Sequence, residues 1–101
     1  MSCSVTSVFT FKIESTFDEW VAIFDSEDAE KRHAEYDIKP LYRGVSKEDP
    51  QKVIVIHQAP EGNVQQFVEA NGDWMATHRV DLSTIDETSW TDSLNKDNCC
   101  D

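Results

Sequence analysis

The residues that could carry chemistry in this chain are few, and two histidines stand out. His57 ends the apolar run VIVI of residues 53–56. A histidine in an apolar cleft can act as an acid or a base near neutral pH; the alternative is an imidazole bonded to backbone or water. His78 follows Trp74 by four residues, so a helix that reaches His78 would present both rings to a flat aromatic ligand. Alternatively, Trp74 fills the core and His78 is its exposed neighbour.

Tyr42 and Arg43 are candidate ligand-binding residues. They are adjacent in an expected strand and therefore point to opposite faces of the sheet. A guanidinium, from Arg43 or Arg79, can hold a ligand carboxylate through paired hydrogen bonds. In a chain this acidic, an internal ion pair is the competing interpretation of either arginine.

The sequence predicts no cofactor and no metal site. It has only three glycines, which are too dispersed for a phosphate-binding loop or a dinucleotide-binding turn. A metal site would require His33, His57 and His78 to converge from separate elements. His33 instead lies near the end of an expected helix, where the helix dipole favours a cation.

Length and charge narrow the class of protein. The 101 residues suit one domain, which we expect over residues 1–90, with a polar tail over 91–101. A net charge of −11 disfavours binding to nucleic acids and to anionic membrane surfaces. We see no signal peptide and no stretch that could span a bilayer. The cysteines occur at positions 3, 99 and 100, without metal-binding spacing, and we interpret them as reduced thiols of a cytoplasmic protein.

Hydrophobic periodicity predicts the elements of the first half. Residues 7–13 alternate apolar and polar side chains as a strand does. Ser15 or Thr16 can cap a helix that we expect to continue to about residue 34, with Phe17, Trp20, Val21 and Phe24 on one face. A strand over residues 38–46 contains Pro40, which cannot donate a ladder hydrogen bond and therefore predicts an edge strand.

The second half predicts a strand over 52–58, a helix over 63–70 that stops at Asn71-Gly72, a short turn capped by Asp73, and a weak last strand between residues 82 and 90. The order βαββαβ is that of the ferredoxin-like α+β plan. In this plan an antiparallel four-stranded sheet has its first and third strands at the centre and two helices on one face.

The apolar run of residues 53–56 also predicts assembly. A sheet covered on one side should alternate, but here Val53 and Val55 point one way while Ile54 and Ile56 point the other. If either pair stayed exposed to water, the protein would lose about 3–6 kcal/mol of stabilisation from hydrophobic burial. We therefore predict a homodimer through the sheet face. The alternative is a monomer whose C-terminal segment, with Ile85 and Trp90, covers that face.

The segments FTFKIESTFDEWVAIFDS and RHAEYDIKPLYRGVSKEDPQKVIVIHQAPEGNVQQFVEANGDWMATHRVDLSTIDETSW carry a resemblance to a small family of proteins from marine cyanobacteria and their phages. The family implies no activity. More distantly, the plan resembles the dimeric α+β barrel superfamily, which includes monooxygenases, haem-degrading enzymes, isomerases and stress proteins. Haem degradation in that superfamily relies on an Asn, a Trp and a His, and the first strand, SVFTFKI, offers no Asn.

Two functions follow as hypotheses. The first is a small homodimeric α+β barrel that binds a small apolar ligand or serves as an accessory or stress protein. The second is a cofactor-independent monooxygenase or isomerase for a small apolar or aromatic substrate, with His57 and His78 as acid–base candidates. An enzyme should enclose a cavity with an imidazole pointing inward.

Overall fold

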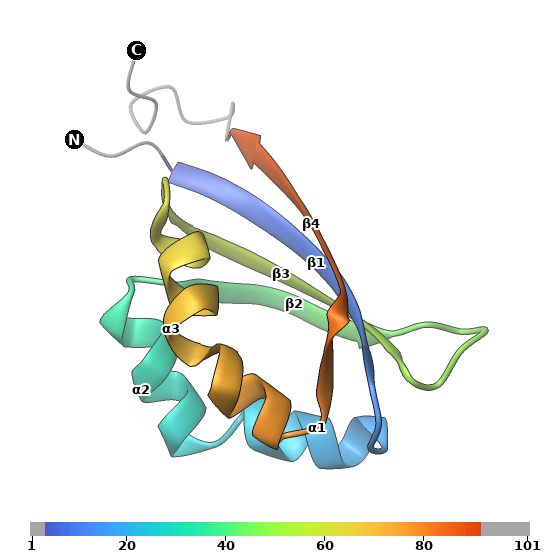
Figure 1. The fold of residues 1–101 in the computed structure, drawn as a ribbon. Helices are drawn as coiled ribbons and strands as arrows, with labels where there is room; N and C mark the ends of the chain where they lie inside the picture. The colour runs from blue at the N-terminus through green and yellow to red at the C-terminus, as the bar shows by residue number, and fades with distance from the viewer. Residues whose placement is uncertain (1–3, 92–101) are drawn as a thin grey trace.

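One antiparallel sheet and three helices make up the computed structural model of this chain, which describes residues 4–91. In chain order the elements are β1 (Ser4–Ile13), α1 (Phe17–Phe24), α2 (Glu27–Glu35), β2 (Lys39–Val45), β3 (Lys52–Pro60), α3 (Asn63–Thr77) and β4 (Val80–Thr91). The strands lie in the order β2-β3-β1-β4, and all the helices lie on one side of them (Figure 1). The predicted α+β class and the central position of β1 and β3 are confirmed.

The first predicted helix is two helices, and Ser26 is the reason. Of the two predicted caps, Ser15 and Thr16, it is Thr16 that caps α1: its hydroxyl accepts from the Glu19 amide, and the Glu19 carboxylate accepts in return from the Thr16 amide. At the other end of α1, the Ser26 hydroxyl donates to the Ile23 carbonyl and accepts from the Ala29 amide. Ser26 therefore begins α2 as its N-cap. The prediction of one helix to residue 34 was wrong because it took no account of this internal cap.

The predicted helix stop at Asn71-Gly72 was also wrong, since α3 continues to Thr77. The Asn71 side chain is buried and donates to the Phe67 carbonyl one turn earlier (3.0 Å). Its oxygen accepts from Arg32 Nη1 of α2 (2.6 Å). An asparagine whose polar atoms are satisfied inside the protein does not need to end the helix.

The last strand is longer than its sequence suggests. β4 spans 12 residues and pairs with β1 at the edge of the sheet. The register shifts between Thr10 and Lys12, and there the Lys12 amide donates to Thr84 Oγ1 (2.8 Å). This side-chain bond replaces a ladder bond and lets β4 continue past the irregularity. Thr91 belongs to β4, whereas the rest of the predicted polar tail and all the cysteines lie outside the described residues.

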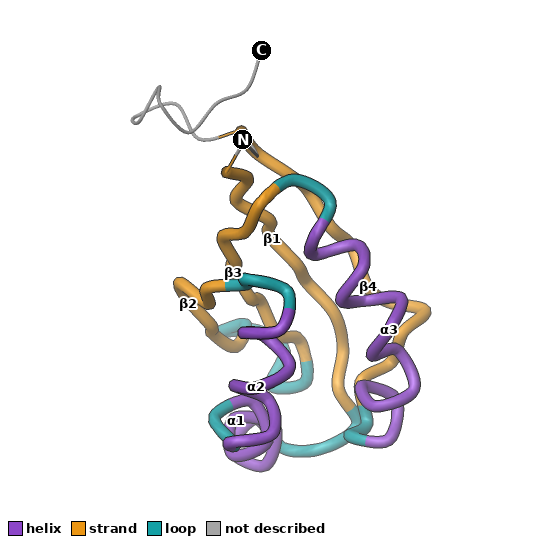
Figure 2. Tube along the Cα trace, turned by 90° about the vertical axis from the view of Figure 1, so that its left-hand side faces the viewer, coloured by secondary structure: helices purple, strands orange, loops and turns teal. Residues whose placement is uncertain are grey.

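The two faces of the sheet differ sharply. Val53 and Val55 face the helices and are 0% and 2% exposed, whereas Ile54 and Ile56 are only partly buried on the other side. Figure 2 views the helical side, with α1 and α2 beside α3. We call the opposite side the open face, defined by Val8, Tyr42, Ile54, Ile56 and Trp90. Within residues 4–91, no helix is long and apolar enough to cross a membrane.

Candidate functional site

A partly enclosed cavity lies between the sheet and the helices. Its volume is about 70 Å³, and its walls come from β1, β3 and β4 and from all three helices. Aromatic rings dominate these walls, from Phe9, Phe11, Trp20, Phe24, Phe67 and Trp74. No Asp, Glu, Lys or Arg side chain of the described chain lines the cavity. The polar atoms inside it therefore come chiefly from imidazoles.

His57 points into this cavity from β3. It occupies the same face of the strand as Val53 and Val55, so the strand alternation directs it toward the helices. Its side chain is only 7% exposed. Neither Nδ1 nor Nε2 finds a hydrogen-bond partner among the described residues. Such a pair of unsatisfied atoms is costly in a folded protein and marks a site that a polar group could complete.

His33 of α2 lies opposite His57, and together we call them the imidazole pair. Their ring centroids are 5.1 Å apart with planes inclined at 56°. Phe24 stacks on His57 at 6.2 Å with an interplanar angle of 3°, and Phe67 stacks on His33 at 5.0 Å. The imidazole pair is thus held between aromatic rings from α1 and α3.

Burial sets the protonation state of the imidazole pair. It lowers the pKa of His57 to about 3, and repulsion from a charged His33 contributes further in the same direction. Burial also lowers the pKa of His33, although a hydrogen bond from its ring to the Ala29 backbone opposes this. Both rings are therefore neutral at pH 7.

Arg32 ties together the helices that form the cavity wall. Besides its bond to Asn71, its guanidinium lies over the Trp74 ring at 4.6 Å and its Nε donates to Asp28 (3.1 Å). Trp74 in turn contacts His78 edge-to-face at 5.2 Å. Both residues line the cavity, so the structure brings His57, Trp74 and His78 around one space.

Tyr42 and Arg43 lie away from the cavity. Arg43 faces the helices, where it pairs with Asp25 at the end of α1 and lies 5.6 Å from the Phe24 ring. Tyr42 points to the open face and is 56% exposed. Among residues 4–91, no group of three or more His, Cys, Asp and Glu side chains gathers in a way that could hold a metal ion.

Sequence reasoning missed His33 as a partner of His57. The explanation from the helix dipole treated His33 as a surface cation, but its side chain is 6% exposed. The signal was present in the spacing of Ala29, His33 and Tyr36, which fall at i, i+4 and i+7. Ala29 is buried and Tyr36 packs against the core, so this stripe is the inner face of α2.

Comparisons with known proteins support the fold. Residues 3–92 match the family model described as "Domain of unknown function (DUF3764)". The crystal structure of protein Atu4242 from Agrobacterium tumefaciens is similar, with a TM-score of 0.55, 9% identity, and coverage of 88% of this chain and 93% of that one. A conserved protein from Methanosarcina mazei Go1 gives a TM-score of 0.51 at 12% identity, covering 91% and 95%. No curated protein matches the sequence.

Proposed function

We propose that this chain, which belongs to the family described as "Domain of unknown function (DUF3764)", is a homodimeric small-ligand-binding protein of the α+β barrel type. The observation that carries the proposal is the imidazole pair in an aromatic cavity, with both nitrogens of His57 unpartnered among the described residues. An apolar pocket with a few convergent polar groups is the usual form of a small-molecule site.

Binding is better supported than acid–base catalysis. A general base works best when its pKa is close to the operating pH. Because the pKa of His57 is about 3, its imidazole is a weak base at pH 7. A neutral imidazole nevertheless offers one donor and one acceptor, which suits hydrogen bonding to a ligand. The monooxygenase or isomerase alternative would need a ligand that raises this pKa.

The open face supports the dimer. Tyr42, Ile56 and Val8 occur side by side across β2, β3 and β1. Tyr42 and Trp90 are among the most exposed large hydrophobic side chains described, at 56% and 61%. A row of this kind is typical of a surface that is covered in the functional assembly.

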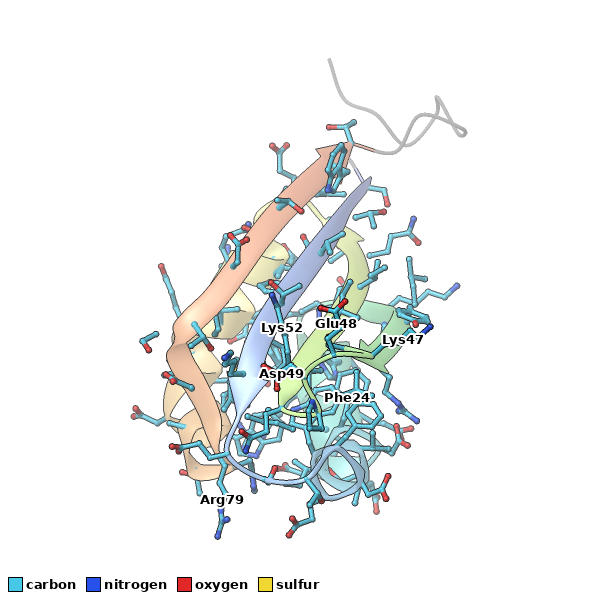
Figure 3. The ribbon with its side chains drawn as sticks, turned by 90° about the vertical axis from the view of Figure 1, so that its right-hand side faces the viewer. Phe24, Lys47, Glu48, Asp49, Lys52 and Arg79 are labelled. Atoms are coloured by element: carbon cyan, nitrogen blue, oxygen red, sulfur yellow. The ribbon has the colours of Figure 1, made fainter. Side chains whose placement is uncertain are left out.

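The distribution of acidic residues favours a second copy of this chain as the partner that covers the open face. Although the chain carries a net charge of −11, β1, β2 and β3 contain no Asp or Glu. A basic partner would be drawn to the acidic helices, whereas two open faces can meet without bringing carboxylates of these strands together. The β2–β3 loop, with Lys47 and Glu48, projects on this side (Figure 3), and Asp49 of the same loop pairs with Lys12 of β1 (3.4 Å). Charges of both signs at this edge suit a two-fold contact.

Two finer expectations accompany the proposal. The resemblance to proteins of marine cyanobacteria and their phages implies such an origin for this chain. The composition implies a cytoplasmic location. Both stay predictions, and a cytoplasmic location would agree with the reduced thiols that we expect of its cysteines.

The ligand site is tested with toluene as an apolar probe, followed by NMR of labelled protein. We expect saturable shifts confined to residues that line the cavity, including the ring signals of His57. Val68→Phe, which adds bulk at the α3 wall, should abolish them, while Ala70→Phe on the exposed side of α3 should not. If toluene produces no saturable shift in the unmodified protein, or if both variants bind equally, the cavity is not a ligand site.

A further inference from the structure

The hydrogen-bonding groups of the imidazole pair define the chemistry of the missing partner. His33 lines the cavity beside His57, with their ring centroids 5.1 Å apart. Neutral His57 has one N–H and one lone pair, and both lack a partner among the described residues. His57 therefore offers one donor and one acceptor to a molecule in the cavity.

A charged ligand does not fit these groups. The part of the chain that lines the cavity contributes no Asp, Glu, Lys or Arg. A carboxylate or an ammonium group would lose its hydration without meeting an opposite charge. A hydroxyl group, by contrast, is neutral and can either donate to the lone pair of His57 or accept from its N–H.

The aromatic side chains that line the cavity favour a ligand whose hydroxyl is attached to a planar apolar ring. Phe24 and Phe67 already stack on the imidazole pair, and Phe9 meets His57 edge-to-face at 5.9 Å. The cavity of about 70 Å³ is smaller than the engineered cavity of about 150 Å³ that takes up benzene. An aromatic ligand must therefore displace an adaptable side chain, and the unbranched Met75 at the α3 wall can move with little strain.

We propose that the cavity selects a neutral, hydroxylated small aromatic molecule of the phenol class. Its hydroxyl forms one hydrogen bond with His57, either donating to the lone pair or accepting from the N–H. The ring lies among Phe9, Phe24 and Phe67. This inference rests on the proposed ligand-binding function and names the class of ligand that the same site takes.

Phenol and toluene form the decisive pair of probes because they have nearly the same shape. A site that recognises only apolar area binds toluene more tightly, since a methyl group leaves water more readily than a hydroxyl. A site that supplies a hydrogen bond to the hydroxyl from an otherwise unpartnered imidazole should reverse this order, with phenol up to about tenfold tighter. Dissociation constants come from NMR titration of the whole chain at pH 7, with benzoate as the charged control.

The variant His57→Phe keeps a ring at this position and removes both nitrogens. We expect it to reverse the preference, so that toluene binds more tightly than phenol, while Gln65→Phe on the exposed surface of α3 keeps the unmodified order. A thermal melt of each variant checks that it is folded. If His57→Phe does not fold, the ring shifts of His57 on adding phenol to the unmodified protein provide the same test.

The possible failures are distinguishable. If toluene binds in the cavity more tightly than phenol, the ligand site stands and recognition of a hydroxyl is wrong. If benzoate binds as well as phenol, selection for neutral ligands is wrong. If neither phenol nor toluene binds, the proposed function fails together with this inference, and the polar atoms of His57 serve only to bind water.

Discussion

The two faces of the sheet are built from alternate residues of the same strands, yet they meet different surroundings. Along β3, Val53, Val55 and His57 are buried beneath the helices, while Ile54 and Ile56 between them remain partly exposed. Among the described residues, the buried side-chain nitrogen and oxygen atoms all have a hydrogen-bond partner except the two nitrogens of His57 on the helix-covered face. The open face has no cover within the described chain. One face thus lacks a polar partner of small size, and the other lacks an apolar partner of large area.

Two tryptophans give the largest expected contrast between the faces. Trp20 is 5% exposed and packs against Phe11, Phe17 and Phe24. Trp20→Ala should lower the free energy of unfolding by about 3–5 kcal/mol at every protein concentration. Trp90→Ala should change the stability of the isolated subunit by less than about 0.5 kcal/mol. Urea denaturation of both variants at low concentration measures the difference, and equal losses would contradict the distinction between the faces.

The pH dependence of stability tests the state of the buried imidazoles. Unfolded His57 takes up a proton below pH 6.5, but in the folded chain it does so only below about pH 3. The unfolded state therefore binds more protons between these values, and stability falls as the pH falls from 6.5 toward 3. Between pH 7 and pH 5, His57 should account for a loss of about 2 kcal/mol.

His57→Phe is the control for this prediction. It should remove the His57 share of the loss while leaving the contribution that His33 makes in the same direction. Urea titrations at pH 7 and pH 5 compare the two proteins. A parallel decline in both would mean that His57 titrates normally in the folded chain.

Structural features that depend on neighbouring residues could be predicted from the sequence, whereas features that depend on distant residues could not. The helix cap at Ser15 or Thr16, the two-faced apolar run of β3 and the proline-bearing edge strand depend on neighbouring residues, and each was predicted from the sequence. The helix break at Ser26 was missed because one unbroken polar face runs through it. The continuation of α3 through Asn71 depends on Arg32, which lies 39 residues away in sequence. The His33–His57 contact likewise joins two distant elements.

Substitutions at the adjacent β3 residues Ile54 and Val55 compare the two faces of the sheet directly. Val55→Thr places a hydroxyl in the core beneath the helices and should cost about 1–3 kcal/mol, whatever the protein concentration. Ile54→Thr places the same group on the open face, where water can reach it in the separated subunit. Its cost should be small at low concentration and should grow as the subunits associate. Denaturation midpoints measured across a concentration series would contradict this if both variants behaved alike.

Gly44 should give the smallest effect. A Cβ at this position would lie 2.8 Å from the Tyr42 hydroxyl, so Gly44→Ala must displace the Tyr42 ring from its place over Gly44. The ring end of Tyr42 is exposed and can shift, and we therefore expect less than about 0.5 kcal/mol of lost subunit stability. A weaker self-association and altered Tyr42 ring signals in NMR spectra should accompany it. Unchanged association would remove Tyr42 from the interface.

Self-association tests directly the claim that a second copy covers the open face. Sedimentation equilibrium of the unmodified chain at micromolar concentration should give twice the subunit mass of 11.5 kDa. Ile56→Lys on the open face should return the chain to a monomer. Val45→Lys, at an exposed strand position on the other face, should leave the dimer intact. A single 11.5 kDa species for the unmodified chain throughout this range would contradict the account.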